Sequence, residues 1–100
     1  MIMKEIYFGH FRVVVVEHIK QIEDSQPTSH TTEWFLLRYL KRIVKNIDEP
    51  ASPGKVEGTV RSLVRFYVDN IDEKSELGDR CTRIYEAYKK ALREQQEKNS

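Results

Sequence analysis

Three polar interruptions divide this chain into four segments of helical length, and they constrain the fold more than any other feature. Two of them contain proline: residues 24–29 (DSQPTS) and residues 48–54 (DEPASPG). The third, residues 69–75 (DNIDEKS), contains neither proline nor glycine and is the weakest signal. Proline and clusters of Ser, Asp, Asn and Gly favour turns, so we expect the connections there.

The second segment, residues 31–47, has the spacing of an amphipathic helix. Ser29 or Thr31 can cap its start, and Glu33 lies in the first turn, where the helix dipole favours a negative charge. Its apolar residues recur at steps of three and four, which places them on one face of a helix. They are Leu36, Leu37, Tyr39, Leu40, Ile43, Val44 and Ile47.

The third and fourth segments show the same periodicity. The third opens with Ser52 and Pro53, a capping residue followed by proline at the first helical position. Its apolar stripe is Val56, Val60, Leu63, Val64, Tyr67 and Ile71. The stripe of the fourth is Leu77, Cys81, Ile84, Tyr85, Tyr88, Ala91 and Leu92. Residues 94–100 are polar, and we expect this tail to fray.

The first segment, residues 4–23, permits two interpretations. Its helical stripe comprises Phe8, Phe11, Val15, Ile19 and Ile22. However, residues 13–16 are four consecutive valines, which are poor helix formers. The rival structure is a β-hairpin with Gly9 and His10 as the turn between residues 6–8 and 11–16. We favour the helix, because a lone hairpin would need a helix to cover it and the stripe continues smoothly to Ile22.

These segments predict an all-α fold, a four-helix up-down bundle forming a single domain over residues 1–100. The alternative is an N-terminal β-hairpin packed on three helices. As a helix, the first segment has surplus apolar residues, Ile6, Val13 and Val16, on a side away from its main stripe. Such a helix is either central in its own fold or buried by another chain. We therefore expect either self-association as a homodimer through these residues or a wider core within one monomer.

Composition excludes several classes of function. The net charge is +1, so no global basic field draws the protein to nucleic acid or to acidic membranes. The longest purely apolar run covers four residues, 13–16, far short of a membrane span. One cysteine permits no internal disulfide, and residues 1–5 lack the features of a signal peptide. We expect a cytoplasmic protein that does not enter membranes.

The second segment carries the most distinctive surface. Arg38, Lys41, Arg42 and Lys45 project from the face opposite its apolar stripe, and Trp34 falls on that same basic face. Trp and Arg often dominate the energetics of protein–protein contacts. An aromatic ring beside a row of cations is also suited to stacking a nucleic-acid base while the cations neutralise phosphates. A third interpretation is an ordinary solvated charged face.

Signals for catalysis or metal binding are weak. His10 and His18 are eight residues apart, which is not the spacing of a helical metal pair, and Cys81 lies on an apolar stripe. Arg12 and His18 have a spacing found in HEPN-like ribonucleases, in which the imidazole handles protons and the cation holds phosphate. The spacing is too common among helical proteins to identify a family.

The sequence therefore predicts a small non-catalytic binding or regulatory protein that acts through protein–protein contacts, without cofactor or metal. Its predicted partner surface is Trp34, Arg38, Lys41, Arg42 and Lys45. A nucleic-acid-binding regulator using the same residues is the first alternative. A ribonuclease that uses Arg12 and His18 is the second.

Overall fold

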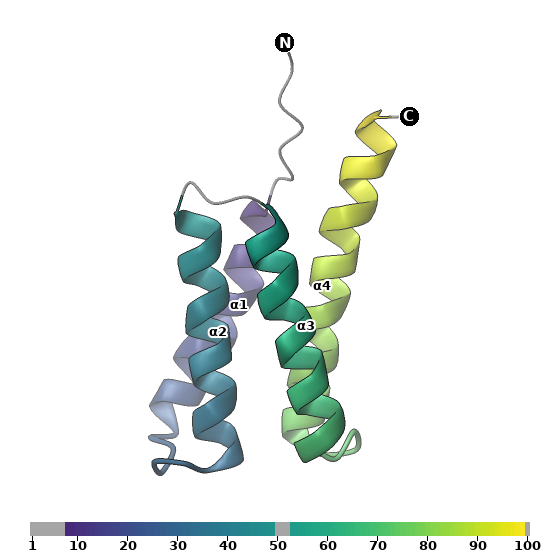
Figure 1. Cartoon of the computed structure of the whole chain (residues 1–100). Helices are drawn as coiled ribbons and strands as arrows, with labels where there is room; N and C mark the ends of the chain where they lie inside the picture. Colours follow the sequence, from purple (N-terminus) through teal and green to yellow (C-terminus); the bar gives the residue numbers. More distant parts are fainter. Residues whose placement is uncertain (1–7, 50–52, 100) are drawn as a thin grey trace.

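A computed structural model describes residues 8–49 and 53–99 of the chain. They form four α-helices, α1 (Gly9–Asp24), α2 (Thr32–Asp48), α3 (Pro53–Asn70) and α4 (Glu76–Asn99), and the described residues contain no strand. Successive helices run in opposite directions (Figure 1). Helix α1 packs against α2 and α4, and α3 packs against α2 and, least closely, α4. The predicted all-α, up-down four-helix bundle is confirmed.

The alternative β-hairpin is wrong, because residues 11–16 lie within α1. Ile6 falls outside the described residues. Helix α1 forms despite the four valines because Val15 is fully buried and Val14 packs against the core. The burial of Val15 contributes roughly 1.5–3 kcal/mol, which matches the total propensity cost of about 2 kcal/mol for the four valines, and the partly buried Val14 adds to it.

Side-chain oxygens cap two helix starts. Thr31 precedes α2, and its Oγ1 accepts a hydrogen bond from the backbone N–H of Trp34 at 3.3 Å. Ser75 precedes α4, and its Oγ accepts from the N–H of Gly78 at 3.0 Å. Glu33 occupies the first turn of α2, as predicted. Pro53 opens α3, whereas the predicted cap, Ser52, lies outside the described residues.

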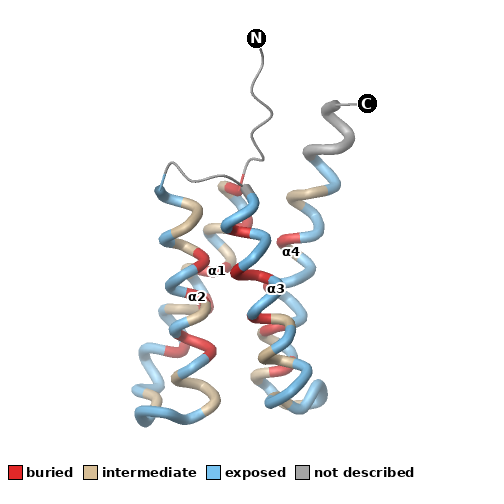
Figure 2. Tube along the Cα trace, viewed as in Figure 1, coloured by how far each residue is buried: buried red, intermediate tan, exposed pale blue. Residues whose placement is uncertain are grey.

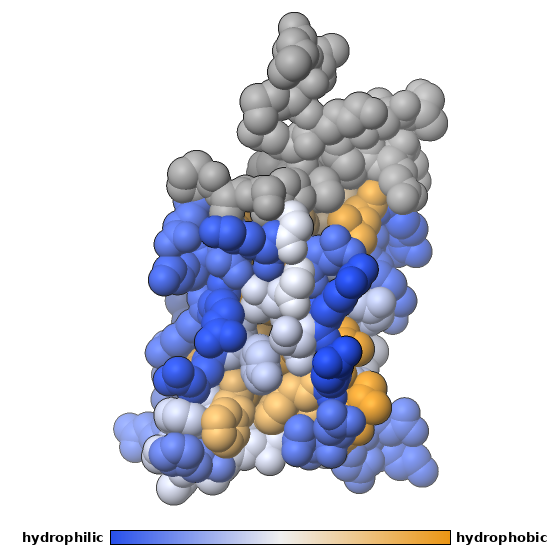
Figure 3. Space-filling view, viewed as in Figure 1, coloured by the Kyte–Doolittle hydropathy of each residue, from blue (hydrophilic) through white to orange (hydrophobic). Residues whose placement is uncertain are grey.

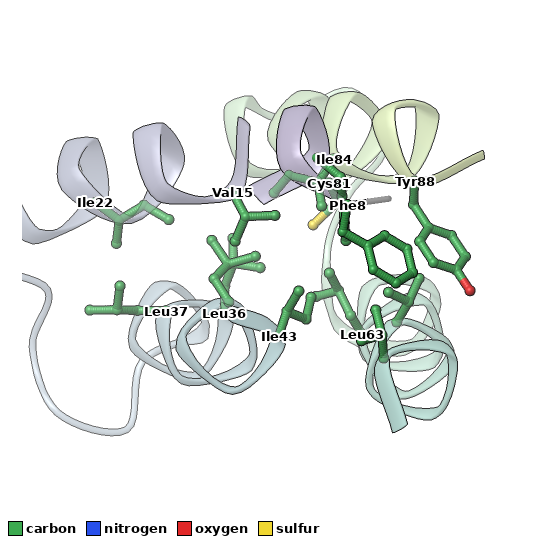
Figure 4. Close-up of a cluster of buried hydrophobic side chains, with 14 residues drawn as sticks. Phe8, Val15, Ile22, Leu36, Leu37, Ile43, Leu63, Cys81, Ile84 and Tyr88 are labelled. Atoms are coloured by element: carbon green, nitrogen blue, oxygen red, sulfur yellow. The ribbon is translucent and has the colours of Figure 1, made fainter. Parts of the chain in front are cut away.

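One hydrophobic core runs along the inside of the bundle. The buried positions face inward from all four helices (Figure 2). Within it the Phe11 and Tyr88 rings pack together, 5.4 Å apart between centroids. A close-up shows side chains from α1 and α4 meeting those of α2 and α3 (Figure 4). The buried residues include Phe8, Val15, Ile22, Leu36, Leu37, Leu40, Ile43, Val56, Val60, Leu63, Cys81 and Ile84.

Helix α4 is the longest of the four, with 24 residues, and its C-terminal end extends past the other helices (Figure 1). Its backbone is helical to Asn99, and the fraying expected for residues 94–100 stays a prediction. None of the described helices combines the length and the apolar character needed to cross a membrane.

Candidate interaction surfaces

The predicted basic face lies along the outer side of α2. Helical spacing brings its four cations to one side, and Lys55 near the start of α3 extends the row. Together with Asn46 and Glu49, these residues line an open groove of about 540 Å³. Asn46 links α2 to α3, because its Nδ2 donates a hydrogen bond to Oγ1 of Thr59 at 2.7 Å. The groove therefore has five cations and one carboxylate on two helices. Its cations are Arg38, Lys41, Arg42, Lys45 and Lys55.

Trp34 stands beside this groove. The Arg38 guanidinium lies over the indole ring, 5.0 Å from its centroid, so the predicted proximity of Trp34 to the basic row is confirmed. Two further aromatic neighbours of the indole come from the α1–α2 connection and from α2 itself. His30 lies 4.7 Å away and Phe35 4.9 Å away, between ring centroids. The indole is half-buried and has three side-chain neighbours, which favours a role as an anchor over that of an open stacking platform.

Two of the five cations are partly neutralised. Nζ of Lys41 lies 2.8 Å from a carboxylate oxygen of Glu23 on α1, and Nζ of Lys45 lies 4.0 Å from one of Glu49. These pairs are exposed, and exposed pairs are weak and easily exchanged. Arg42 and Lys55 have no ion-pair partner among the side chains that the structure describes, those of residues 8–49 and 54–94. The groove keeps a positive potential.

The structure places Arg12 and His18 in two separate interactions. Both Nε and a terminal nitrogen of Arg12 donate to the Asp48 carboxylate, at 2.7 and 2.9 Å. This hydrogen-bonded pair lowers the pKa of the Asp48 carboxyl and raises that of Arg12. His18 is buried and faces α4 instead. Six residues of helix leave the two side chains about 120° apart around α1.

Arg80 is a central residue that sequence reasoning missed. Its side chain is only 16% exposed and joins α4 to α1. One terminal nitrogen donates to Nδ1 of His18 at 3.0 Å and to the Gln21 side-chain oxygen, and the other lies 3.5 Å from Glu76. In the sequence Arg80 is one of several cations of the fourth segment, and nothing in its spacing singles it out. Only the packing of α1 on α4 gives it partners.

The predicted self-association residues do not form a continuous patch among the described residues. Val13 is 51% exposed, but His10 and Glu17 are exposed beside it on α1. Val16 is half-buried, and Ile6 lies outside the described residues. A dimer through this side of α1 stays a prediction.

A more extensive apolar surface lies between α3 and α4, where packing is loosest. It has an apolar hollow of about 260 Å³ and continues into a wider groove toward Leu92. Val68 and Tyr85 flank the groove and are 72% and 40% exposed. In Figure 3 apolar surface is visible at the right-hand side, beside α4, among hydrophilic side chains; a further apolar area lies over the lower parts of α2 and α3. The apolar periodicity of a single helix does not predict this surface, because the surface depends on the distance between α3 and α4.

The thiol of Cys81 and the hydroxyl of Tyr88 belong to residues of the hydrophobic core. Cys81 is buried with its sulfur among core side chains (Figure 4), and burial raises the pKa of its thiol to about 11. Burial likewise raises the pKa of the Tyr88 hydroxyl. In the part of the chain that the structure describes, no three His, Cys, Asp or Glu side chains are grouped to hold a metal ion.

No family model matches this chain. No curated protein and no solved structure is significantly similar to it.

Proposed function

We propose that this protein is a non-catalytic binding protein, and that the α2 groove holds an acidic segment of a partner protein. The observation that carries the proposal is the combination of five cations lining one groove with a Trp34 ring fixed by Arg38 beside it. Desolvated aromatic and arginine side chains supply most of the energy at protein interfaces. A row of surrounding lysines selects a negatively charged partner and accelerates its association.

The spacing of the cations favours a helical partner segment. Arg38, Arg42 and Lys45 step by four and three residues along α2. An acidic helix lying alongside α2 repeats its carboxylates with the same period and can meet each cation in turn. We propose that this contact is made in the cytoplasm, on the basis of the single buried cysteine and the absence of any possible internal disulfide.

Nucleic acid is the alternative occupant of the same groove. The surroundings of Trp34 favour the peptide over it, because the Arg38 guanidinium lies over the indole and the His30 ring lies 4.7 Å from it, where a stacked base would compete with them. Ribonuclease activity is a separate, weaker alternative, since Arg12 is held by Asp48 and His18 by Arg80.

The test uses Trp34, the only tryptophan of the chain, as its reporter. A synthetic Glu-rich helical peptide is titrated into the protein, and tryptophan emission and heat of binding are both recorded. We expect a saturable change that weakens as salt is raised. Single-stranded and double-stranded oligonucleotides of the same charge are titrated in parallel.

A matched pair of variants distinguishes the groove from general charge. Arg42→Gln with Lys45→Gln removes two groove cations and leaves Arg38 on Trp34, so the reporter is unchanged. Lys20→Gln with Lys90→Gln removes the same charge from exposed positions on α1 and α4. Only the groove variant is expected to lose peptide binding. Equal losses in both variants, or tighter binding of the oligonucleotides than of the peptide, would contradict the proposal.

A further inference from the structure

The apolar groove between α3 and α4 is a second surface, independent of the basic groove on α2. The two grooves share no lining residue. Val64 and Val68 from α3 face Tyr85 and Leu92 from α4 across the opening. Beneath them the hollow reaches the core residues Leu63, Cys81 and Ile84. In a stable monomer of this size, an opening that exposes core-facing positions is typical of an interaction surface.

The two most exposed apolar residues of the groove are suited to act as anchors. Val68 is 72% exposed on the α3 side, and Tyr85 is 40% exposed on the α4 side. Lys89 covers part of the Tyr85 ring, with Nζ 4.9 Å from its centroid, and keeps the ring in place at the edge of the hollow. A protruding apolar residue beside an apolar hollow allows one molecule to fill the hollow of another identical molecule.

Charges on α3 indicate which partner fits. The outer ridge of the helix is basic at Arg61 and Arg65 and acidic at Asp69, one turn further along. Arg61 is already paired with Glu57 of its own helix at 2.8 Å. Arg65 and Asp69 form no ion pair with any described residue. Two α3 helices that cross antiparallel at the level of residue 67 along the axis place each Arg65 opposite the other Asp69, on the side of the helix away from the Tyr67 side chain.

We propose that the α3–α4 groove is a self-association surface, and that a second copy of this chain occupies it through a two-fold symmetric contact centred near Tyr67. In that contact Val68 of each copy enters the groove of the other, and two Arg65–Asp69 pairs form at its edge. A two-fold axis makes every such contact twice, which is why one self-complementary patch is sufficient. The dimer leaves both α2 grooves accessible, so a partner with two acidic segments is bound more tightly through a raised effective concentration.

The first experiment is sedimentation velocity of the full chain at concentrations from about 1 to 100 µM. We expect a concentration-dependent shift from monomer to dimer. Val68→Glu is expected to weaken the dimer by about tenfold or more, with unchanged helicity because the side chain is exposed. The matched control is Val13→Glu, which places the same charge at an exposed valine on α1. It is expected to leave the dimer intact.

These outcomes are decisive in both directions. A chain that remains monomeric throughout the concentration range overturns the proposal. A dimer that survives Val68→Glu also overturns it, and loss of the dimer in Val13→Glu alone assigns self-association to α1 instead.

The second experiment tests the charge pairing. In a homodimer of the Arg65→Glu variant the introduced carboxylate faces Asp69, and in a homodimer of the Asp69→Arg variant the introduced guanidinium faces Arg65. Like charges then meet at the edge of the contact, so both variants are expected to associate poorly. A mixture of the two variants restores opposite-charge pairing, and we expect the heterodimer to form at a concentration where neither variant pairs alone. No recovery on mixing excludes the two-fold contact near Tyr67. Neither experiment depends on acidic peptide binding, so failure here is distinct from failure of the proposed function.

Discussion

A guanidinium nitrogen of Arg80 donates to Nδ1 of His18 at 3.0 Å, across the contact between α4 and α1. Arginine has no acceptor, so Nδ1 must carry a lone pair and the imidazole is neutral with its proton on Nε2. Burial lowers the pKa of His18 first, and the positive charges of Arg80 and Arg83 lower it further. The carboxylates of Glu17 and Asp79 oppose this shift without reversing it.

This relationship makes stability depend on pH below neutrality. As pH falls past about 6.5, the unfolded chain takes up a proton at His18 before the folded chain does. The free energy of unfolding therefore decreases from about pH 6.5 down through the lowered pKa of the folded protein. Urea unfolding followed by circular dichroism at a series of pH values measures this loss.

His18→Gln is the control for the pH dependence, because an amide oxygen still accepts from Arg80 but does not titrate. The variant is expected to lose less stability than the wild type between about pH 7 and 5. Carboxylates such as Asp48 titrate at lower pH and are common to both proteins, so the difference isolates His18. Parallel curves for the two proteins would show that His18 is not the group responsible.

Two helix glycines are expected to respond to alanine in opposite directions. A Cβ at Gly78 falls against the backbone carbonyl oxygen of Asp72 and 2.8 Å from that of Glu73, in the connection that precedes α4. Backbone atoms cannot yield as a flexible side chain can, so Gly78→Ala is expected to cost about 1–3 kcal/mol. A Cβ at Gly58 meets nothing within 4 Å, and Gly58→Ala is expected to stabilise α3 by about 0.5–1 kcal/mol. Chemical denaturation of both variants measures the two effects, and equal changes would contradict this account.

Cys81 is expected to be inert in the folded protein. A thiol pKa of about 11, against an ordinary value of 9.0, leaves about a hundredfold less thiolate at neutral pH, and the thiolate is the reactive form. Iodoacetamide labelling followed by mass spectrometry is expected to be slow in buffer and fast in concentrated urea. Rapid labelling of the native protein would mean that the sulfur is reached from the α3–α4 hollow.

The purified chain is not expected to cleave RNA. Arg12 is occupied by Asp48, and protonation of His18 at Nδ1 would cost its hydrogen bond from Arg80. Incubation with labelled single-stranded and structured RNAs, with gel analysis, measures this directly. Cleavage that disappears in both Arg12→Ala and His18→Ala would establish the ribonuclease alternative.

Most of the helical layout follows from local sequence. Apolar residues such as Leu36, Leu40 and Ile43 repeat with the period of a helix, and Thr31 and Ser75 place oxygens where helix starts need them. Helix propensity alone does not decide between helix and strand for residues 11–16. The unfavourable propensity of the valines is a local property, whereas the other helices bury Val15 and so stabilise the helix.

One of the two surfaces could be predicted from the sequence, and the other depends on tertiary packing. The α2 basic row was visible in the sequence, since cations on one helix keep their spacing wherever that helix packs. Lys55 joined the groove only through the folding of α3 against α2, and Arg80 acquired His18 as a partner only when α4 met α1. The opening between α3 and α4 depends on the separation of two helices, and that distance is decided by the packing of the whole core rather than by any one segment.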